Sequence, residues 1–152
     1  MKILDKLVLD SHINQEMGIS DWLEIDQSMI NEFANVTKDR QFIHIDPDKA
    51  KNSTFGGTIA HGFLSLSMLS YFAENGFGFA IKDYPIALNY GFDKIRFISP
   101  VKVDAQIRGR STLRSVSEKI EGQVLVKQRV VIDIKGVSKP ALIADWLTMY
   151  IT

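Results

Sequence analysis

The chain has 152 residues, of which 45% are apolar and 24% charged, and its 18 basic side chains balance its 18 acidic ones. This composition is typical of one globular domain spanning residues 1–152, and the zero net charge does not support binding to nucleic acid or to an anionic membrane. The absence of cysteine excludes disulfides, thiol catalysis and cysteine-bound zinc, and it fits a reducing compartment, so we expect a soluble cytoplasmic protein.

The first part of the chain predicts short, irregular elements. The opening segment MKILDKLVLD is interrupted by Asp5 and Lys6, so it does not have the pattern of a signal peptide. The segment GISDWLEI is interpreted as a short strand. Asp26 is expected to cap a helix, because Met29, Ile30, Phe33 and Ala34 follow it at helical spacing. His12 stands alone in a polar stretch, where we expect it to be exposed and without a role.

The middle of the chain predicts a loop followed by a buried helix. The segment DPDKAKN is expected to form a brief helix with Asp46 at its N-cap and Pro47 in its first turn, and Gly56 and Gly57 form a loop. Beyond the loop, apolar residues point in nearly every direction around a helix, which is typical of a buried helix. They are Phe63, Leu64, Leu66, Met68, Leu69, Tyr71 and Phe72. The apolar run 60–72 is shorter than the roughly 20 residues that a membrane-spanning helix needs.

The back half predicts an antiparallel sheet. Apolar and polar residues alternate in 101–113 and again in 123–136, which indicates two strands with one buried and one solvent-facing side. Residues 115–122 are expected to turn between these strands, so that the strands pair antiparallel. Residues 136–140 are expected to form the next turn.

Two further strands complete the predicted sheet. Residues 141–152 are rich in aromatic and aliphatic side chains, and residues 86–97 form a similar segment with a bulge or bend at Gly91. A buried helix followed by four or more antiparallel strands favours an α+β fold in which a curved sheet wraps around the helix. Such a sheet leaves strand edges uncovered, so we expect association into a dimer.

Asp39 and His44 form the first candidate site. They lie five residues apart in a predicted loop between two predicted helices, and loops held by a rigid frame often carry catalytic side chains. A carboxylate beside an imidazole is an acid/base pair in which one group takes a proton while the other gives one. The alternative is a surface aspartate and a partly buried histidine in an ordinary turn.

His61 and Gly62 form the second candidate site, at the start of the predicted buried helix. Backbone N–H groups in the first turn of a helix have no partner within the helix and carry the positive end of its dipole. A glycine there lets the oxygen of a ligand approach the N–H, which describes an oxyanion hole. The alternative is that Gly62 permits close helix–sheet packing and that His61 is a structural histidine.

His44, His61 and nearby Asp46 could in principle bind a metal ion. The chain contains no recognised metal-ligand motif, and we expect neither a metal nor a cofactor. It also lacks the G-x-S-x-G, P-loop and G-x-G-x-x-G motifs, so serine-hydrolase, NTPase and dinucleotide-binding functions have no support.

The segments DRQFIHID and FGGTIAHGF together resemble the hydratase signature of the MaoC-like dehydratases, which include the (R)-specific enoyl-CoA hydratases. Gln41 and Phe42 stand where that signature has Asn and Pro, and this form resembles the NodN-like branch. The segment LNYGFDKIRFISPV also resembles the strand that follows the helix in this family. The resemblance is clear over 30–101 and continues by strand pattern beyond.

This resemblance implies a hot-dog fold, a dimer or higher homo-oligomer, and an active site near the subunit interface. It implies that the chain interconverts a trans-2-enoyl thioester, of CoA or acyl-carrier protein, and a 3-hydroxyacyl thioester, with no cofactor. By position, Asp39 and His44 match the catalytic pair, and Gly62 matches the residue whose N–H binds the thioester carbonyl. Ser70 matches a supporting helix serine. We also assign Gly57 and His61 to substrate binding.

The sequence is also compatible with two other functions. The first is thioester hydrolysis, because hot-dog thioesterases also place an acidic residue near a helix N-terminus. The second is a non-catalytic subunit that binds acyl thioesters. The Asp39 and His44 pair argues against the second, whereas Phe42 keeps it open.

Overall fold

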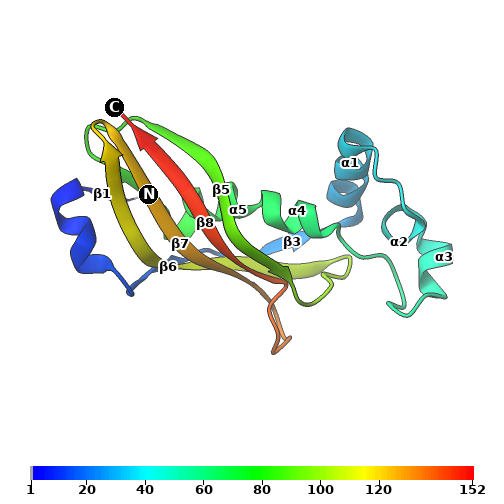
Figure 1. The fold of residues 1–152 in the computed structure, drawn as a ribbon. Helices are drawn as coiled ribbons and strands as arrows, with labels where there is room; N and C mark the ends of the chain where they lie inside the picture. The colour runs from blue at the N-terminus through cyan, green and yellow to red at the C-terminus, as the bar shows by residue number, and fades with distance from the viewer. Residues whose placement is uncertain (1) are drawn as a thin grey trace.

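The computed structural model describes residues 2–152 and confirms the α+β hot-dog fold, in which a curved antiparallel sheet wraps around a helix (Figure 1). The sheet order is β2, β6, β7, β8, β5, with β3 also paired to β6, and all of its pairings are antiparallel. Its strands are β2 (Glu16–Ile19), β3 (Leu23–Ile25), β5 (Ile86–Phe97), β6 (Ala105–Ile120), β7 (Gln123–Ile134) and β8 (Leu142–Ile151). Two short strands, β1 (Lys2–Leu4) and β4 (Phe79–Ile81), form a separate parallel pair.

The central helix runs in three consecutive pieces along the inner side of the sheet: α4 (Gly62–Ser67), α5 (Leu69–Phe72) and η2 (Ala73–Phe77). The expectation that it is buried on every side is wrong for the single chain. Phe63 and Tyr71 are 66% and 44% exposed, because the sheet covers the helix from one side only. The side of the helix away from the sheet therefore carries aromatic surface.

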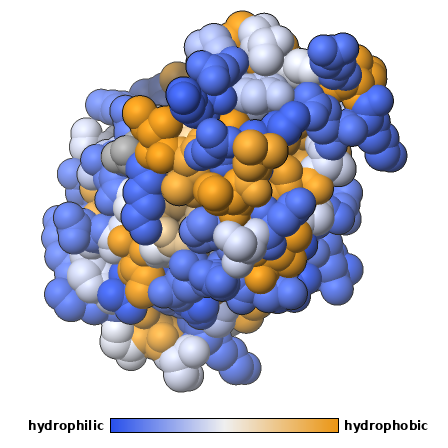
Figure 2. Space-filling view, turned by 90° about the vertical axis from the view of Figure 1, so that its left-hand side faces the viewer, coloured by the Kyte–Doolittle hydropathy of each residue, from blue (hydrophilic) through white to orange (hydrophobic). Residues whose placement is uncertain are grey.

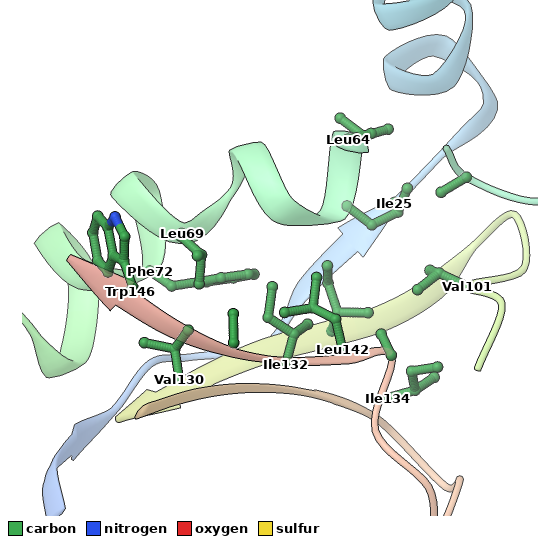
Figure 3. Close-up of a cluster of buried hydrophobic side chains, with 14 of the residues drawn as sticks. Ile25, Leu64, Leu69, Phe72, Val101, Val130, Ile132, Ile134, Leu142 and Trp146 are labelled. Atoms are coloured by element: carbon green, nitrogen blue, oxygen red, sulfur yellow. The ribbon is translucent and has the colours of Figure 1, made fainter. Parts of the chain in front are cut away.

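The main core lies between this helix and the sheet (Figure 3). The helix contributes Leu64, Leu69 and Phe72, and the sheet contributes Val130, Ile132, Leu142 and Trp146. The helix lies close to β6 because Gly109 has no side chain: a Cβ there would lie 2.8 Å from Cβ of Phe72. Phe72 is completely buried, and truncating such a side chain to alanine typically costs about 3–5 kcal/mol.

The structure confirms which face of the predicted strands is buried, but some strands begin or end at other residues than predicted. The apolar residues that alternate along β7 are all buried: Val124, Val126, Val130, Ile132 and Ile134. Gly91 lies at a register shift of β5, as predicted. The turn expected over 115–122 is wrong, because β6 continues to Ile120 and only Glu121 and Gly122 turn. The strand expected from Val101 begins only at Ala105, after Asp104 turns the chain with a φ of 64°.

The helical predictions ahead of the site are confirmed. Asp26 caps α1 (Gln27–Thr37), its carboxylate accepting a hydrogen bond of 2.8 Å from Met29 N. Asp46 caps α3 (Pro47–Lys51) in the same way through Lys49 N. The segment GISDWLEI contributes to two strands, β2 and β3, rather than one, because residues 20–22 lie outside both.

The N-terminal segment closes one end of the sheet. The helix η1 (Lys6–His12) buries Leu9 against a second core that includes Leu113 and Tyr150. His12, which was expected to be exposed, is partly exposed, and its Nδ1 lies 2.9 Å from Val8 O. Figure 2 shows hydrophobic residues among hydrophilic ones at this end of the molecule. Among the residues described, no helix has the length and apolar character to cross a membrane.

Candidate active site

Asp39 follows the end of helix α1. Lys38 closes that helix in the left-handed conformation, with a φ of 66°, and turns the chain back toward the helix α2 (Phe42–Ile45). The Asp39 side chain is exposed, and its Oδ1 accepts a hydrogen bond of 3.4 Å from Gln41 N. The carboxylate therefore stands on a short loop whose two ends are held by helices.

His44 lies on α2 and is 6% exposed. Its Nδ1 is 2.7 Å from the carbonyl oxygen of Ile59, and because a carbonyl only accepts, Nδ1 carries the proton. The lone pair of the neutral ring is then on Nε2. Burial lowers the pKa of His44 below its ordinary value of 6.5, and it outweighs the opposing effects of the Ile59 bond and of Asp39. His44 is therefore a neutral proton acceptor near pH 7.

His61 connects the two residues of the pair. Its Nε2 donates a hydrogen bond of 3.0 Å to the backbone carbonyl of Asp39. Its ring stacks on that of His44, with centroids 3.8 Å apart and planes inclined by 23°, and Phe33 contacts the same ring. The side chain is 3% exposed, and its Nδ1 has no hydrogen-bond partner among the described residues.

Ligand atoms of Asp39, His44 and His61 all lie within 4.8 Å of one another. The residues that sequence spacing suggested are therefore brought together in space. The stacking argues against a shared metal ion, because nearly parallel imidazole rings direct their in-plane lone pairs side by side rather than toward one point. Asp46 does not belong to this group, since its carboxylate caps α3.

A cavity of about 290 Å³ opens beside this cluster. It is lined by His44, Phe55, Ile59, Ala60, Gly62, Ser65, Phe97, Ile98, Ser99, Pro100, Val101 and Ala141. Gly62 is the first residue of α4, and the N–H groups of a first turn have no partner within the helix, so its N–H is available at the cavity wall. A Cβ on Gly62 would lie 2.9 Å from the ring of Phe97, so glycine also permits this close contact.

Two residues assigned to substrate binding lie elsewhere in the single chain. Gly57 is on the loop between Phe55 and Ile59, which both line the cavity, but it is not itself part of the lining. Ser70 is exposed and lines a different hollow, of about 240 Å³, that also includes Trp146 and Tyr150. One chain alone therefore does not bring Ser70 to the cluster.

Sequence reasoning missed two contributors. Ser65 is buried and lines the cavity; its spacing of three from Gly62 places both on one side of α4 and could have indicated it. Gln27 holds the backbone of His44: its Nε2 donates to His44 O at 2.7 Å, and its Oε1 accepts from the Thr58 hydroxyl at 2.5 Å. Nothing in the sequence around Gln27 indicates this contact, which spans 17 residues.

Residues 8–134 match the model of the MaoC like domain. The chain belongs to the MaoC-like family. Over 140 residues it is 43% identical to nodulation protein N of Rhizobium leguminosarum, a match that covers 91% of this chain and 86% of that protein. It is 36% identical over 137 residues to the 3-hydroxyacyl-thioester dehydratase Z of Mycobacterium tuberculosis, covering 90% and 89% of the two chains.

Solved structures agree with this membership at the level of the fold. The monoamine oxidase regulatory protein of Archaeoglobus superposes with a TM-score of 0.78 at 20% identity, covering 100% of this chain and 99% of the other. The R-hydratase PhaJ1 of Pseudomonas aeruginosa superposes with a TM-score of 0.70 at 22% identity, covering 91% and 81%. The MaoC-like fold is thus shared by proteins whose sequences have diverged widely.

Proposed function

We propose that this MaoC-like protein interconverts a trans-2-enoyl thioester and a (R)-3-hydroxyacyl thioester by adding or removing water. The observation that carries the proposal is that a carboxylate oxygen of Asp39 lies within 4.8 Å of a ring nitrogen of His44, and that His44 lines the same cavity as Gly62. Asp39 itself is not part of the cavity lining. The dehydratase activity named for the mycobacterial relative, which is similar along nearly its whole length, supports the proposal.

The pair is suited to activating water. Nε2 of His44 carries a lone pair, and the Asp39 carboxylate only accepts, so together they can hold both hydrogens of one water molecule. The oxygen of that water then attacks C3 of the enoyl group, and one O–H bond breaks as its proton passes to the pair. The same pair returns a proton to C2, and dehydration is the reverse.

Gly62 takes the developing charge in this proposal. As the C3–O bond forms, electrons move through the conjugated system onto the thioester oxygen. The N–H of Gly62 donates a hydrogen bond to that oxygen, aided by the dipole of the first turn of α4. Such a donor helps most when it already points at the site of the developing charge.

His61 acts as a positioning residue rather than as a substrate ligand. It donates a hydrogen bond to the carbonyl of Asp39 and stacks on the ring of His44, so one side chain fixes the positions of both members of the pair. Its Nε2 is hydrogen-bonded to the protein backbone and its side chain is buried, so little of the ring is accessible to a substrate.

We further propose a homodimer that forms along β5. This strand ends the sheet on one side, and its exposed residues include Leu88 and Tyr90. Phe63 and Tyr71 add exposed aromatic surface on the central helix. A second copy would cover the open edge and this surface, and it could bring its own Ser70 toward the cluster of this chain.

The decisive experiment is a spectrophotometric assay with crotonyl-CoA and longer homologues, combined with chiral analysis of the 3-hydroxyacyl product. Loss of enoyl absorbance and formation of the (R)-product are expected. Release of free thiol from saturated acyl-CoA without hydration would instead establish a thioesterase. Tight acyl-CoA binding without turnover over the whole panel would establish a binding subunit.

A further inference from the structure

A second hollow lies on the face of the sheet turned away from the central helix. It has a volume of about 220 Å³ and is lined by Lys94, Arg96, Ile98, Arg129, Ile143, Ala144 and Asp145. Arg129 and Asp145 alternate along their strands with the buried core residues Val130 and Ala144, which places these two charged side chains on the outer face. The hollow therefore spans β5, β8 and β7, which are neighbours in the sheet (Figure 1).

The hollow carries an excess of positive charge. Arg129 is bound to the carboxylate of Asp145 by hydrogen bonds of 2.8 and 3.0 Å, so these two charges neutralise each other. Lys94 and Arg96 form no ion pair within the described residues, and Arg96 donates only to the backbone carbonyl of Ile95. Three cations against one acid leave an excess of two positive charges, in a chain whose formal net charge is zero.

This charged hollow adjoins the catalytic cavity. Ile98 lines both of them, and the cavity lining continues along the chain from Phe97 to Val101. Within a few residues, the end of β5 therefore contributes cations to the outer face of the sheet and lining residues to the cavity on the inner side. Lys94 and Arg96 lie four and two positions before a residue that lines both the hollow and the cavity.

We propose that this hollow binds phosphate on the non-reacting end of the thioester substrate. The inference rests on the proposed function, because it assigns a docking point to the carrier of the acyl group. Ammonium and guanidinium groups are the side chains that bind phosphate best, and arginine can do so with two parallel hydrogen bonds. The phosphates of CoA and the phosphodiester of a carrier-bound phosphopantetheine share this chemistry.

The test compares substrates that differ only in their phosphates. Crotonyl-CoA, crotonyl-3′-dephospho-CoA, a crotonyl carrier-protein thioester and the phosphate-free crotonyl N-acetylcysteamine thioester are assayed with the native protein, Lys94→Ala, Arg96→Ala and the double variant. We expect KM for the phosphate-bearing substrate to rise about 3- to 10-fold in each single variant and further in the double one. Turnover of the N-acetylcysteamine thioester should not change.

A matched control is Lys119→Ala, which removes one exposed positive charge from β6 outside the hollow. It should leave KM for every substrate unchanged, which excludes a general effect of net charge. A larger effect of the variants on CoA than on dephospho-CoA assigns the nucleotide phosphates as the ligand. An effect confined to the carrier-protein thioester assigns the phosphopantetheine phosphate.

Failure of the inference differs from failure of the proposed function. Equal KM values in the native protein and the double variant, with hydration intact, would overturn the phosphate site alone. Absence of hydration with all four thioesters, the phosphate-free one included, would overturn the function. Where the variants affect the CoA thioesters, free CoA supplies a readout independent of activity: its affinity by calorimetry should fall in the double variant, and an unchanged affinity would then overturn the site.

Discussion

The imidazole of His61 stacks on that of His44 with 3.8 Å between ring centroids, while its Nε2 donates to the backbone carbonyl of Asp39. One buried side chain thus contacts both members of the candidate catalytic pair. The two contacts differ in kind, one a hydrogen bond and the other a ring face, so they can be removed separately.

Replacing His61 tests its positioning role. His61→Phe keeps a ring to stack on His44 and loses the donor, whereas His61→Gln keeps a donor near the Nε2 position and loses the ring. We expect kcat to fall about tenfold or more in both with KM little changed, because His61→Phe loses a hydrogen bond of about 1 kcal/mol to the backbone of Asp39 and His61→Gln loses the ring that supports His44, and either loss misplaces one member of the pair. A rise in KM with kcat unchanged would contradict the positioning role and indicate that His61 binds the substrate.

Nuclear magnetic resonance gives a second check on this arrangement. Long-range proton–nitrogen spectra report which ring nitrogen carries the proton. We expect the proton on Nδ1 of His44 and on Nε2 of His61, as their carbonyl partners require. The opposite assignment for either ring would contradict the water-binding geometry proposed for the pair.

Asp39→Asn removes the charge of the carboxylate while keeping its shape. Because loss of a positioned acid or base typically costs 10²–10⁴-fold in rate, we expect kcat for crotonyl-CoA hydration to fall by about that factor. Asp39 is exposed, so the urea midpoint of unfolding should stay close to that of the native protein. Near-normal turnover by this variant would remove Asp39 from the mechanism.

Burial makes His44 a source of pH-dependent stability. Its pKa is lowered by burial in the folded chain, so between that pKa and 6.5 the unfolded chain binds more protons than the folded one. Stability should therefore fall as the pH drops below about 6.5, with a slope of at most about 1.4 kcal/mol per pH unit from this group. Asp39 and His61 are the charged or titratable groups that affect it.

Urea unfolding at pH 7.5 and pH 5.5 measures this effect, and His44→Gln is the comparison because glutamine does not titrate. The native protein should lose more stability than the variant over this interval. Equal losses would show that His44 has the same pKa in the folded and unfolded states. The acid limb of kcat/KM should also lie below pH 6.5.

Gly62→Pro removes the N–H that is proposed to bind the thioester oxygen. Proline is favoured at the first position of a helix, and His61 has the extended backbone, φ −60° and ψ 138°, that a following proline requires. The fold should persist while kcat/KM falls about 10²–10³-fold. The control, Gly62→Ala, keeps the N–H but must displace the Phe97 ring, and a fall as large as that of proline would point to crowding instead.

Leu88→Lys tests the dimer proposed along β5. Leu88 is 50% exposed in the single chain, and a lysine buried without a partner at an interface is strongly unfavourable. The variant should sediment as a monomer where the native protein sediments as a dimer. Val36→Lys, on a residue that is 82% exposed on α1, should leave the assembly unchanged. A dimeric Leu88→Lys would place the interface elsewhere.

Local patterns were sufficient for the elements whose signals are local. Alternation predicted the inner face of β7, Asp26 and Asp46 predicted helix starts, and Gly91 predicted a bulge. The predicted end of a strand was wrong where pairing with another strand determines its length. The pairing of Val116 with Val126 carries β6 past the expected turn, and a pairing between distant residues leaves no signature in either segment alone.

The sequence by itself determined the α+β class, the family resemblance and the candidacy of Asp39, His44 and Gly62, because caps, periodicity and signature spacing depend on neighbouring residues. Only the tertiary structure decided that His61 contacts both Asp39 and His44, that Ser65 lines the cavity, and that Ser70 lines a hollow separate from that cavity. The cations of the outer hollow come from strands about 35 positions apart in the chain, as with Lys94 and Arg129. Which of these side chains meet depends on strand register and helix docking, and both are set by burial of the whole core rather than by any one segment.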